Sequence, residues 1–162
     1  MDINAQDHGG DTALHFAIRR ESEIKTKELL ARKDVNVNVT NNYRSTPLHF
    51  ASMWPNIPAD LFKIILENST NVNAQDEDGN TALHVAIFFK SEITTKILLA
   101  HNDVDVNIKN NDNETALSYA SKWKDIPMDL FQIILERSTN EVEKISKMDR
   151  LSKYLRNLTV HK

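Results

Sequence analysis

Three histidines, His15, His49 and His84, are the residues whose type could support metal binding or proton transfer. Each occurs once per copy of a recurring motif. Packed helices lie about 8–10 Å apart, whereas a zinc ion holds its nitrogen ligands within about 2.1 Å. Histidines that are carried one per motif copy therefore do not converge on a single ion. We expect no metal site and no cofactor in this chain.

Other chemistry-bearing residues give no catalytic constellation. The acidic pairs Glu77/Asp78 and Asp103/Asp105 fall on loops that we expect to be exposed, where solvated carboxylates are poor acid–base catalysts. The three glycines cannot build a phosphate-cradling loop. Because the chain has no cysteine, it has no disulfide, no thiolate nucleophile and no cysteine-bound zinc. We therefore predict that the protein is not an enzyme.

The element that positions these residues is a stretch that recurs four times. One copy, around Thr81, runs Asp-Gly-Asn-Thr-Ala-Leu-His-Val-Ala. Its threonine recurs at positions 12, 46, 81 and 115, so the copies are 34, 35 and 34 residues apart. A threonine before Ala-Leu is a suitable helix N-cap, and Pro47 suits the first helical position, where its missing N–H costs little. Each copy therefore predicts the start of a helix.

A Thr-Pro-Leu-His-x-Ala motif at a period near 33 resembles the signature of the ankyrin repeat. The resemblance covers residues 1–140 and divides them into repeats at about 7–40, 41–75, 76–109 and 110–140. It implies an all-α solenoid of stacked helix-turn-helix units with hairpin fingers. It also implies that the motif histidines bond to the backbone of neighbouring turns, and that the protein recognises a partner protein without catalysis.

A second periodicity separates odd from even repeats. In the odd repeats a short turn leads into the outer helix, in residues 22–30 and 91–99. The even repeats share Trp-x-x-Ile-Pro, where Pro58 and Pro127 block helix continuation and lengthen the turn. A two-repeat unit has been duplicated, so we expect repeats of equal parity to share their turns.

The fingers between repeats are rich in asparagine, which tolerates the left-handed backbone of tight turns. The odd repeats have fingertip glycines, Gly10 and Gly79, where the even repeats have Arg44 and Asn113. We expect the even fingertips to be strained or reshaped. Residues 100–104 stand where the family has a glycine-centred helix end, so we expect that turn to depart from the family's geometry.

Residues 141–162 break the repeat pattern and predict a C-terminal capping helix with a short basic tail. Asn140 can cap this helix, and Glu143 would complete a capping box. Stacked repeats expose an apolar face at each end, and we expect one side of this helix to close the C-terminal end. That side comprises Ile145, Met148, Leu151, Leu155 and Leu158.

Charge is divided unevenly along the chain. The formal net charge of −3 gives no global attraction to nucleic acid. Residues 141–162 hold six cations and three carboxylates, a net charge of +3, which leaves −6 for the preceding residues. The cations are spread around the expected helix, which favours a solvated face over a nucleic-acid patch.

Partners of ankyrin-repeat proteins use a concave surface that is formed by the fingertips and the exposed ends of the inner helices. Residue types enriched at protein interfaces occupy these positions here. Phe88 and Phe89 are the most specific candidates, because the sister repeat has Arg19 and Arg20 at the same positions and the scaffold therefore does not require aromatic residues there. Trp54 and Trp123 recur with the Ile-Pro turn, which leaves a structural role open for both. The candidate partner-binding residues are Arg19, Arg20, Tyr43, Met53, Trp54, Phe88, Phe89, Lys122 and Trp123.

We expect a module that docks one partner protein along this groove, with Met53, Phe88 and Phe89 as apolar anchors. Short chains of this build resemble virus-encoded mimics of inhibitor-of-NF-kappa-B proteins, cyclin-dependent-kinase inhibitors and effectors of intracellular bacteria. We favour an effector or an inhibitor of a host signalling protein. Two alternatives stay open: a structural segment of a larger ankyrin protein, suggested by a start at a repeat boundary, and a nucleic-acid-associated regulator that uses the basic helix.

Location follows from what the sequence lacks. No apolar run approaches the ~18 residues of a membrane span, and the first residues carry no signal peptide. The absence of cysteine fits a reducing compartment. We expect a cytoplasmic monomer without a membrane partner; delivery into a host cell and a nuclear location stay open.

Overall fold

The computed structural model describes residues 1–160, so that Lys162 of the expected basic tail lies outside the described residues. Those residues form nine α-helices and no β-strand. The helices are α1 (Ala13–Arg19), α2 (Glu23–Leu30), α3 (Pro47–Met53), α4 (Ala59–Glu67), α5 (Ala82–Phe88), α6 (Glu92–Ala100), α7 (Ala116–Lys122), α8 (Met128–Arg137) and α9 (Glu141–Val160). None of the described helices has both the length and the apolar character needed to cross a bilayer.

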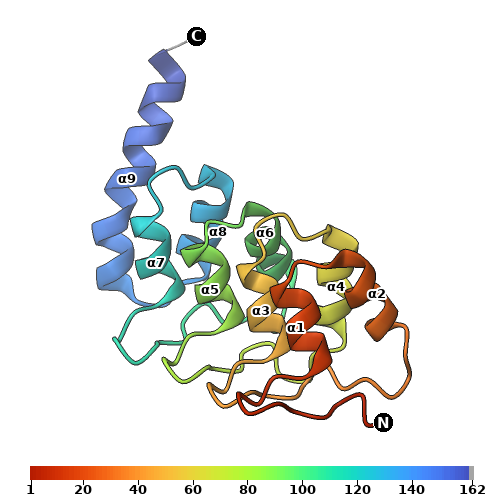
Figure 1. Cartoon of the computed structure of the whole chain (residues 1–162). Coiled ribbons are helices and arrows are strands. Elements are labelled where there is room, and N and C mark those ends of the chain that lie inside the picture. Colours follow the sequence, from red (N-terminus) through yellow and green to blue (C-terminus); the bar gives the residue numbers. More distant parts are fainter. Residues whose placement is uncertain (161–162) are drawn as a thin grey trace.

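The first eight helices form two parallel rows. The inner row consists of α1, α3, α5 and α7, each packed against the next, and the outer row of α2, α4, α6 and α8 is built the same way. Each inner helix also packs against the outer helix that follows it. Figure 1 shows the connecting fingers gathered at one end of the helices and α9 projecting past the stack. The expected all-α solenoid is confirmed.

Each inner helix begins as the motif predicts. The side chains of Thr12, Thr46, Thr81 and Thr115 accept a hydrogen bond from the backbone N–H three residues later, and a complete capping box is present at all four starts. A cap of this kind stabilises a helix by about 1 kcal/mol. This matters here because each inner helix has only 7 residues, too few to be stable alone.

Inner helices end in two ways, according to parity. After α1 and α5 the cap residues Arg20 and Phe89 keep nearly helical angles (φ −82°, ψ 1° and φ −80°, ψ 2°). After α3 and α7 the cap residues Trp54 and Trp123 are extended (ψ 105° and 95°). The φ angles are nearly equal, so the difference in ψ changes the path of the chain after the cap residue. Trp54 and Trp123 are buried in one cluster with Ile57 and Ile126 of the longer turns, whereas Arg20 and Phe89 are exposed. Parity therefore decides which of these aligned side chains reach solvent.

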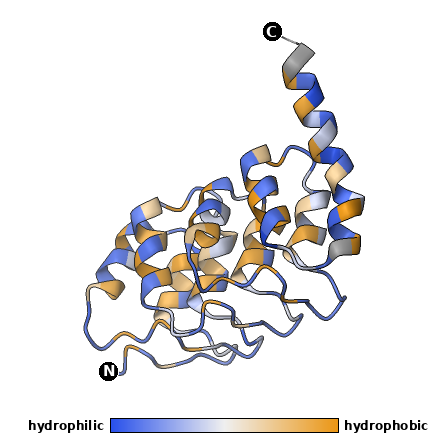
Figure 2. Ribbon diagram, turned by 180° about the vertical axis from the view of Figure 1, so that it is seen from behind, coloured by the Kyte–Doolittle hydropathy of each residue, from blue (hydrophilic) through white to orange (hydrophobic). Residues whose placement is uncertain are grey.

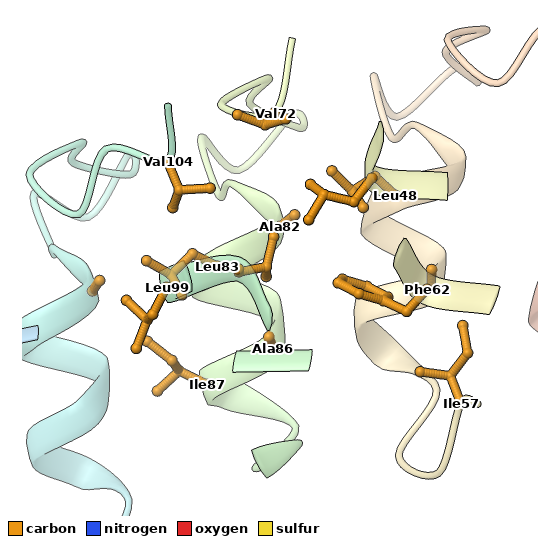
Figure 3. Packing of buried hydrophobic residues seen from close by; sticks show 14 of the residues in the cluster. Leu48, Ile57, Phe62, Val72, Ala82, Leu83, Ala86, Ile87, Leu99 and Val104 are labelled. Carbon is orange, nitrogen blue, oxygen red and sulfur yellow. The ribbon is translucent and has the colours of Figure 1, made fainter. Parts of the chain in front are cut away.

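A continuous apolar core fills the space between the rows. The motif leucines Leu14, Leu48, Leu83 and Leu117 are at most 2% exposed, and burying each contributes roughly 1.5–3 kcal/mol. In Figure 3 the ring of Phe62 lies between Leu48 and Ile57 and points toward Ala86. Small alanines on the inner helices leave room for such rings, since the alanine that ends each motif copy (Ala17, Ala51, Ala86 or Ala120) is buried.

Side-chain amides join neighbouring fingers, in addition to backbone hydrogen bonds such as that from the Glu77 N–H to the Tyr43 carbonyl. Asn73 shows the pattern: its Oδ1 accepts from the Asp105 N–H at 2.9 Å, and its Nδ2 donates to the Asp103 carbonyl at 2.7 Å. The equivalent asparagines Asn4, Asn38 and Asn107 make the same bridges to the segment that follows the next outer helix. These asparagines therefore join neighbouring repeats, and their own φ angles are not positive.

Left-handed residues occur at the fingertips instead. Gly10, Arg44, Gly79 and Asn113 have φ angles of 78°, 57°, 77° and 62°. The even fingertips therefore keep the shape of the odd ones, and Arg44 holds a backbone conformation that is strained for a residue with a Cβ atom. Of the two expected outcomes, strain and reshaping, the structure shows strain.

The turn after α6 does depart from a glycine-centred helix end. Its cap residue, His101, is extended (φ −83°, ψ 125°). The Arg137 guanidinium of α8 donates to the Leu99 carbonyl at 2.7 Å and to the Val104 carbonyl. An arginine from the next helix pair thus fixes both sides of this turn.

Helix α9 starts where expected but presents a different face to the stack. The Asn140 side chain accepts from the Glu143 N–H at 3.1 Å, as a cap should. The Glu143 carboxylate accepts from the hydroxyls of Thr115 (3.1 Å) and Ser118 (2.5 Å). In addition, Arg150 bonds to backbone carbonyls at the end of α7.

The apolar side of α9 predicted to cover the stack is mostly exposed, so that expectation is wrong for four of its five residues. Only Leu151 packs against the core. Ile145, Met148, Leu155 and Leu158 are exposed. The helix contacts α7 and α8 through its first half, and its last turns, with both hydrophilic and hydrophobic residues, project beyond the stack (Figure 2).

Candidate functional site

The three motif histidines connect neighbouring helix pairs. In each, Nδ1 accepts from the N–H of the capping threonine, at 3.1 Å for His15 and His49 and 3.2 Å for His84. The proton must therefore sit on Nε2, which lies 3.2, 3.0 and 3.1 Å from the carbonyls of Ser45, Asn80 and Glu114 respectively. Burial lowers the pKa of all three imidazoles. The expectation that they bond to the backbone of neighbouring turns is confirmed.

A groove of about 440 Å³ lies between the fingers and the exposed ends of α3 and α5. Met53, Phe88 and Phe89, the three expected anchors, all line it. Phe88 is 65% exposed and Phe89 is 45% exposed. The structure therefore brings the three apolar candidates together on one surface.

Phe88 and Phe89 belong to an aromatic cluster with Tyr119 of α7. The rings of Phe88 and Phe89 meet edge to face with centroids 5.3 Å apart, and the Phe88 and Tyr119 centroids are 6.2 Å apart. The Tyr119 hydroxyl donates to Asn80 Oδ1 at 3.2 Å and accepts from Asn110 Nδ2 at 3.0 Å. Its ring is thus held at the edge of the groove.

Sequence reasoning missed Tyr119 as a site residue. It occupies the motif position filled by Phe16, Phe50 and Val85 in the other copies. A hydroxyl at a position otherwise occupied by apolar side chains is the signal that could have identified it, because a buried phenol needs hydrogen-bond partners.

Trp54 and Trp123 are corrections to the predicted binding surface. They are 6% and 7% exposed and belong to the core. Although they align with Arg20 and Phe89, they are followed by the longer Ile-Pro turn and are buried in one cluster with its isoleucines, Ile57 and Ile126. The recurrence of tryptophan with the Ile-Pro turn reflects this packing.

Arg19 and Lys122, two of the cationic candidates, each lie next to a carboxylate; Lys122 lines a hollow that shares Phe88 and Tyr119 with the groove, whereas Arg19 belongs to α1, of which no residue lines the groove. Arg19 is paired with Asp11 at 3.1 Å and lies over the Phe16 ring. Lys122 is paired with Glu114, and its ammonium lies 5.5 Å from the centroid of the Tyr119 ring. These interactions hold Lys122 beside the groove and Arg19 on the first helix pair.

Two candidates lie apart from the groove. Tyr43 is exposed at its fingertip but does not line the groove. Arg20 lines a separate hollow at the N-terminal end of the stack, next to Phe16. The structure therefore does not unite all the predicted contact residues in one site.

Larger hollows exist at the N-terminal end (about 790 Å³) and between α4 and α6 on the outer side (about 560 Å³). Size alone does not identify a binding site. The groove at α5 is distinguished by its exposed aromatic cluster, the kind of surface that supplies most of the binding energy at protein interfaces.

Comparison with known proteins agrees with the fold. Residues 1–76 and 56–145 match the family described as ankyrin repeats (3 copies). The chain is 37% identical over 106 residues to the putative ankyrin repeat protein L371 of Acanthamoeba polyphaga mimivirus, covering 65% of this chain and 13% of the viral protein. It is 29% identical over 151 residues to Rabankyrin-5 of Mus musculus, covering 86% of this chain and 12% of that protein.

A third relative is the B-cell lymphoma 3 protein homolog of Mus musculus, 31% identical over 120 residues, which are 70% of this chain and 26% of that protein. The chain thus spans about a tenth to a quarter of the length of these curated relatives. Ankyrin repeats generally serve as protein-interaction modules without catalysis. The motif, the stacked helix pairs and these matches together show that this chain belongs to the ankyrin-repeat family.

Proposed function

We propose that this chain binds a partner protein in the groove lined by Met53, Phe88, Phe89 and Tyr119. The exposure of Phe88 and Phe89 is the observation that carries the proposal. Leaving such a side chain in water forgoes roughly 1.5–3 kcal/mol relative to burying it. The first helix pair has two arginines at these positions, so the repeat architecture does not require aromatics there. A partner that covers the cluster would supply the missing burial.

The proposed role is that of an effector or inhibitor that occupies a surface of a host signalling protein. A module without a catalytic constellation acts by occupancy, and the relatives include both a viral protein and cellular ones. We place this activity in the cytoplasm and treat the chain as a monomer, with residues 1–140 as the repeat unit and α9 as its C-terminal cover.

The other two functions considered draw less support. The basic C-terminal helix is a weaker candidate for a nucleic-acid site, because the Arg150 guanidinium is already bonded to backbone carbonyls of the stack. A structural segment of a larger ankyrin protein agrees with the much greater length of the relatives, but gives no reason for an exposed aromatic cluster.

The test is a pull-down from eukaryotic cell lysate with quantitative mass spectrometry, using the full chain and two double variants. F88A/F89A should reduce the captured partner at least about tenfold, as expected for hot-spot residues, without lowering the melting temperature. I24A/I93A, which trims exposed isoleucines of α2 and α6, is the matched control and should capture as much partner as the unmodified chain.

Two results would contradict the proposal. Equal loss of melting temperature and of binding in F88A/F89A would mark the phenylalanines as core residues. Loss of binding in I24A/I93A alone would move the partner to the outer helices.

A further inference from the structure

The groove at α5 is lined by charges of one sign. Asp76, Asp78 and Asp112 line it with the aromatic cluster, and no lysine or arginine is among its lining residues. The two lining histidines, His49 and His84, are buried and neutral, because burial lowers the pKa of each and Nδ1 serves as an acceptor. The groove therefore presents three carboxylates around an apolar floor.

The cationic candidates form their ion pairs with other carboxylates. Arg19 and Lys122 are paired with Asp11 and Glu114. Within residues 1–160, no ion pair includes any of the three groove aspartates. Lys90 lies in an adjoining hollow with Glu114 and Lys122 rather than in the groove.

The fold does not require this acidity. Asp76 Oδ1 accepts from the N–H groups of Asp78 (3.0 Å) and Asn80 (2.8 Å), which shapes its finger. The neutral residues Asn41 and Asn110 make the same two bonds in the even fingers. An amide at position 76 would therefore fold the finger equally well, and the negative charge there is a property of the surface alone.

The same holds for the other two groove aspartates. Asp78 and Asp112 align with Gly9 and Tyr43, so the fingertip accepts uncharged residues at this position. Both are exposed. Their charges are available to a partner and can be removed without touching the stack.

We propose that the partner of this groove is a basic segment in which lysine or arginine residues flank a large apolar side chain. The apolar side chain packs on Phe88 and Phe89, and the cations reach Asp78 and Asp112 on neighbouring fingers. Elements of neighbouring repeats lie about 8–10 Å apart, which corresponds to about three residues of extended chain or about five to seven residues of a helix. The inference deepens the proposed function and rests on it, because it concerns the same groove.

The experiment selects phage-displayed random peptides of about 12 residues on the immobilised full chain. Selected peptides should be enriched in lysine and arginine beside aromatic or branched apolar residues. Synthetic versions, and matched versions with glutamate in place of the cations, are then titrated by fluorescence polarisation. The basic peptides should bind at least about tenfold more tightly than the acidic ones, and their affinity should fall as salt screens the carboxylates.

Two charge variants distinguish the effect of the groove carboxylates from the effect of the net charge of the chain. D76N/D78N/D112N should weaken the basic peptides at least about tenfold and flatten the salt dependence. E67Q/D103N/D105N removes the same three charges on α4 and on the loop after α6, away from the groove, and should change affinity less than about twofold. Equal effects of the two variants would overturn the inference, as would peptides selected without enrichment in cations.

The two proposals fail in different ways. If F88A/F89A abolishes binding but D76N/D78N/D112N does not, the groove binds a partner that is not basic, and only the present inference is wrong. If F88A/F89A has no effect, the proposed function is wrong. Light scattering tests whether a second copy of this chain occupies the groove instead. Self-association that D76N/D78N/D112N abolishes would assign the groove to the basic α9 of that copy and overturn the inference.

Discussion

At the residue scale, the motif histidines carry the most specific structural duty in the chain. Each one joins a capping threonine in its own helix pair to a backbone carbonyl of the next pair. Only the neutral imidazole with its proton on Nε2 can do both, because an imidazolium has no acceptor nitrogen. Protonation would therefore break the cap and leave a charge buried between helix pairs.

This geometry predicts that stability falls in mild acid. Burial lowers the folded-state pKa of each histidine below its ordinary value of 6.5. Above that value both states are neutral and stability is complete. As the pH falls from 6.5 toward the lowered pKa, the unfolded chain binds protons that the folded chain excludes, and stability is lost. Urea unfolding between about pH 7.5 and 5.5 should show a falling midpoint.

Two glutamine variants test the assignment to buried histidines. H49Q replaces an imidazole by an amide that does not titrate, and should give a shallower pH dependence than the unmodified chain. H8Q changes an exposed histidine and should leave the slope unchanged. A slope that H8Q removes and H49Q preserves would contradict the prediction.

At the scale of the element, helix termination explains what sequence could and could not predict. The odd–even pattern is visible in the sequence, and the structure shows two kinds of helix end with the same parity. What the pattern does not show is that the tryptophan before each Ile-Pro turn is buried in the core. Trp54 was therefore predicted as a contact residue alongside Phe89, although only Phe89 is exposed.

The fold was predictable because its starts and its core depend on local chemistry. A capping threonine, a buried leucine and a small alanine act within a few residues of each other, so a short motif identifies them. The groove depends on contacts between copies: Tyr119 reaches Phe88 and Asn80 from the next helix pair. Sequence reasoning was limited in the same way for α9, because the spacing of its apolar residues does not predict that Arg150 and Glu143 make the polar contacts with the stack.

The C-terminal ends of α1 and α5 are positions where we expect a glycine substitution to stabilise the protein. Glu21 and Lys90 follow these helices with φ angles of 53° and 57°. Their N–H groups bond to the carbonyls of Ile18 and Ile87, which is the left-handed helix end that favours glycine. Each of E21G and K90G should raise the free energy of unfolding by about 0.5–1 kcal/mol, because glycine removes the Cβ strain. Chemical denaturation measures the change.

A glycine one residue earlier provides the control. Arg20 has φ −82°, where glycine offers no relief and only adds freedom to the unfolded chain. R20G should therefore lower the free energy of unfolding by about 0.5–1 kcal/mol. If R20G and E21G changed stability in the same direction, backbone strain at Glu21 would not be the explanation.

At the scale of the whole molecule, stability is passed from each helix pair to its neighbours. Among α1 to α8, every inner helix packs against the adjacent inner helices and its own outer partner, so the stack approximates a one-dimensional array. The consequences of a change at one end should decay along the array. Helix α9 is placed to test this, since it contacts only α7 and α8 among the other described helices.

Arg150 is the residue through which α9 acts on the stack. Its guanidinium donates to the carbonyls of Ala120 (3.3 Å), Ser121 (3.0 Å), Trp123 (2.8 Å) and Lys124 (2.8 Å), at the end of α7 and in the turn that follows it. It also lies over the Phe131 ring, 5.1 Å from its centroid. R150A should therefore lower the local stability of α7 and α8 by about 1–3 kcal/mol.

Amide hydrogen exchange measures this locally. In R150A, protection against amide exchange should fall in α7 and α8. It should stay unchanged in α1 and α2, because the effect would have to pass from α7 through α5 and α3 to reach α1. K153A, which trims an exposed lysine one turn further along α9, should leave protection unchanged throughout. A uniform loss of protection in R150A would show that the stack unfolds as a single cooperative unit; a loss confined to α7 and α8 would establish that the repeats are stabilised by their neighbours in turn.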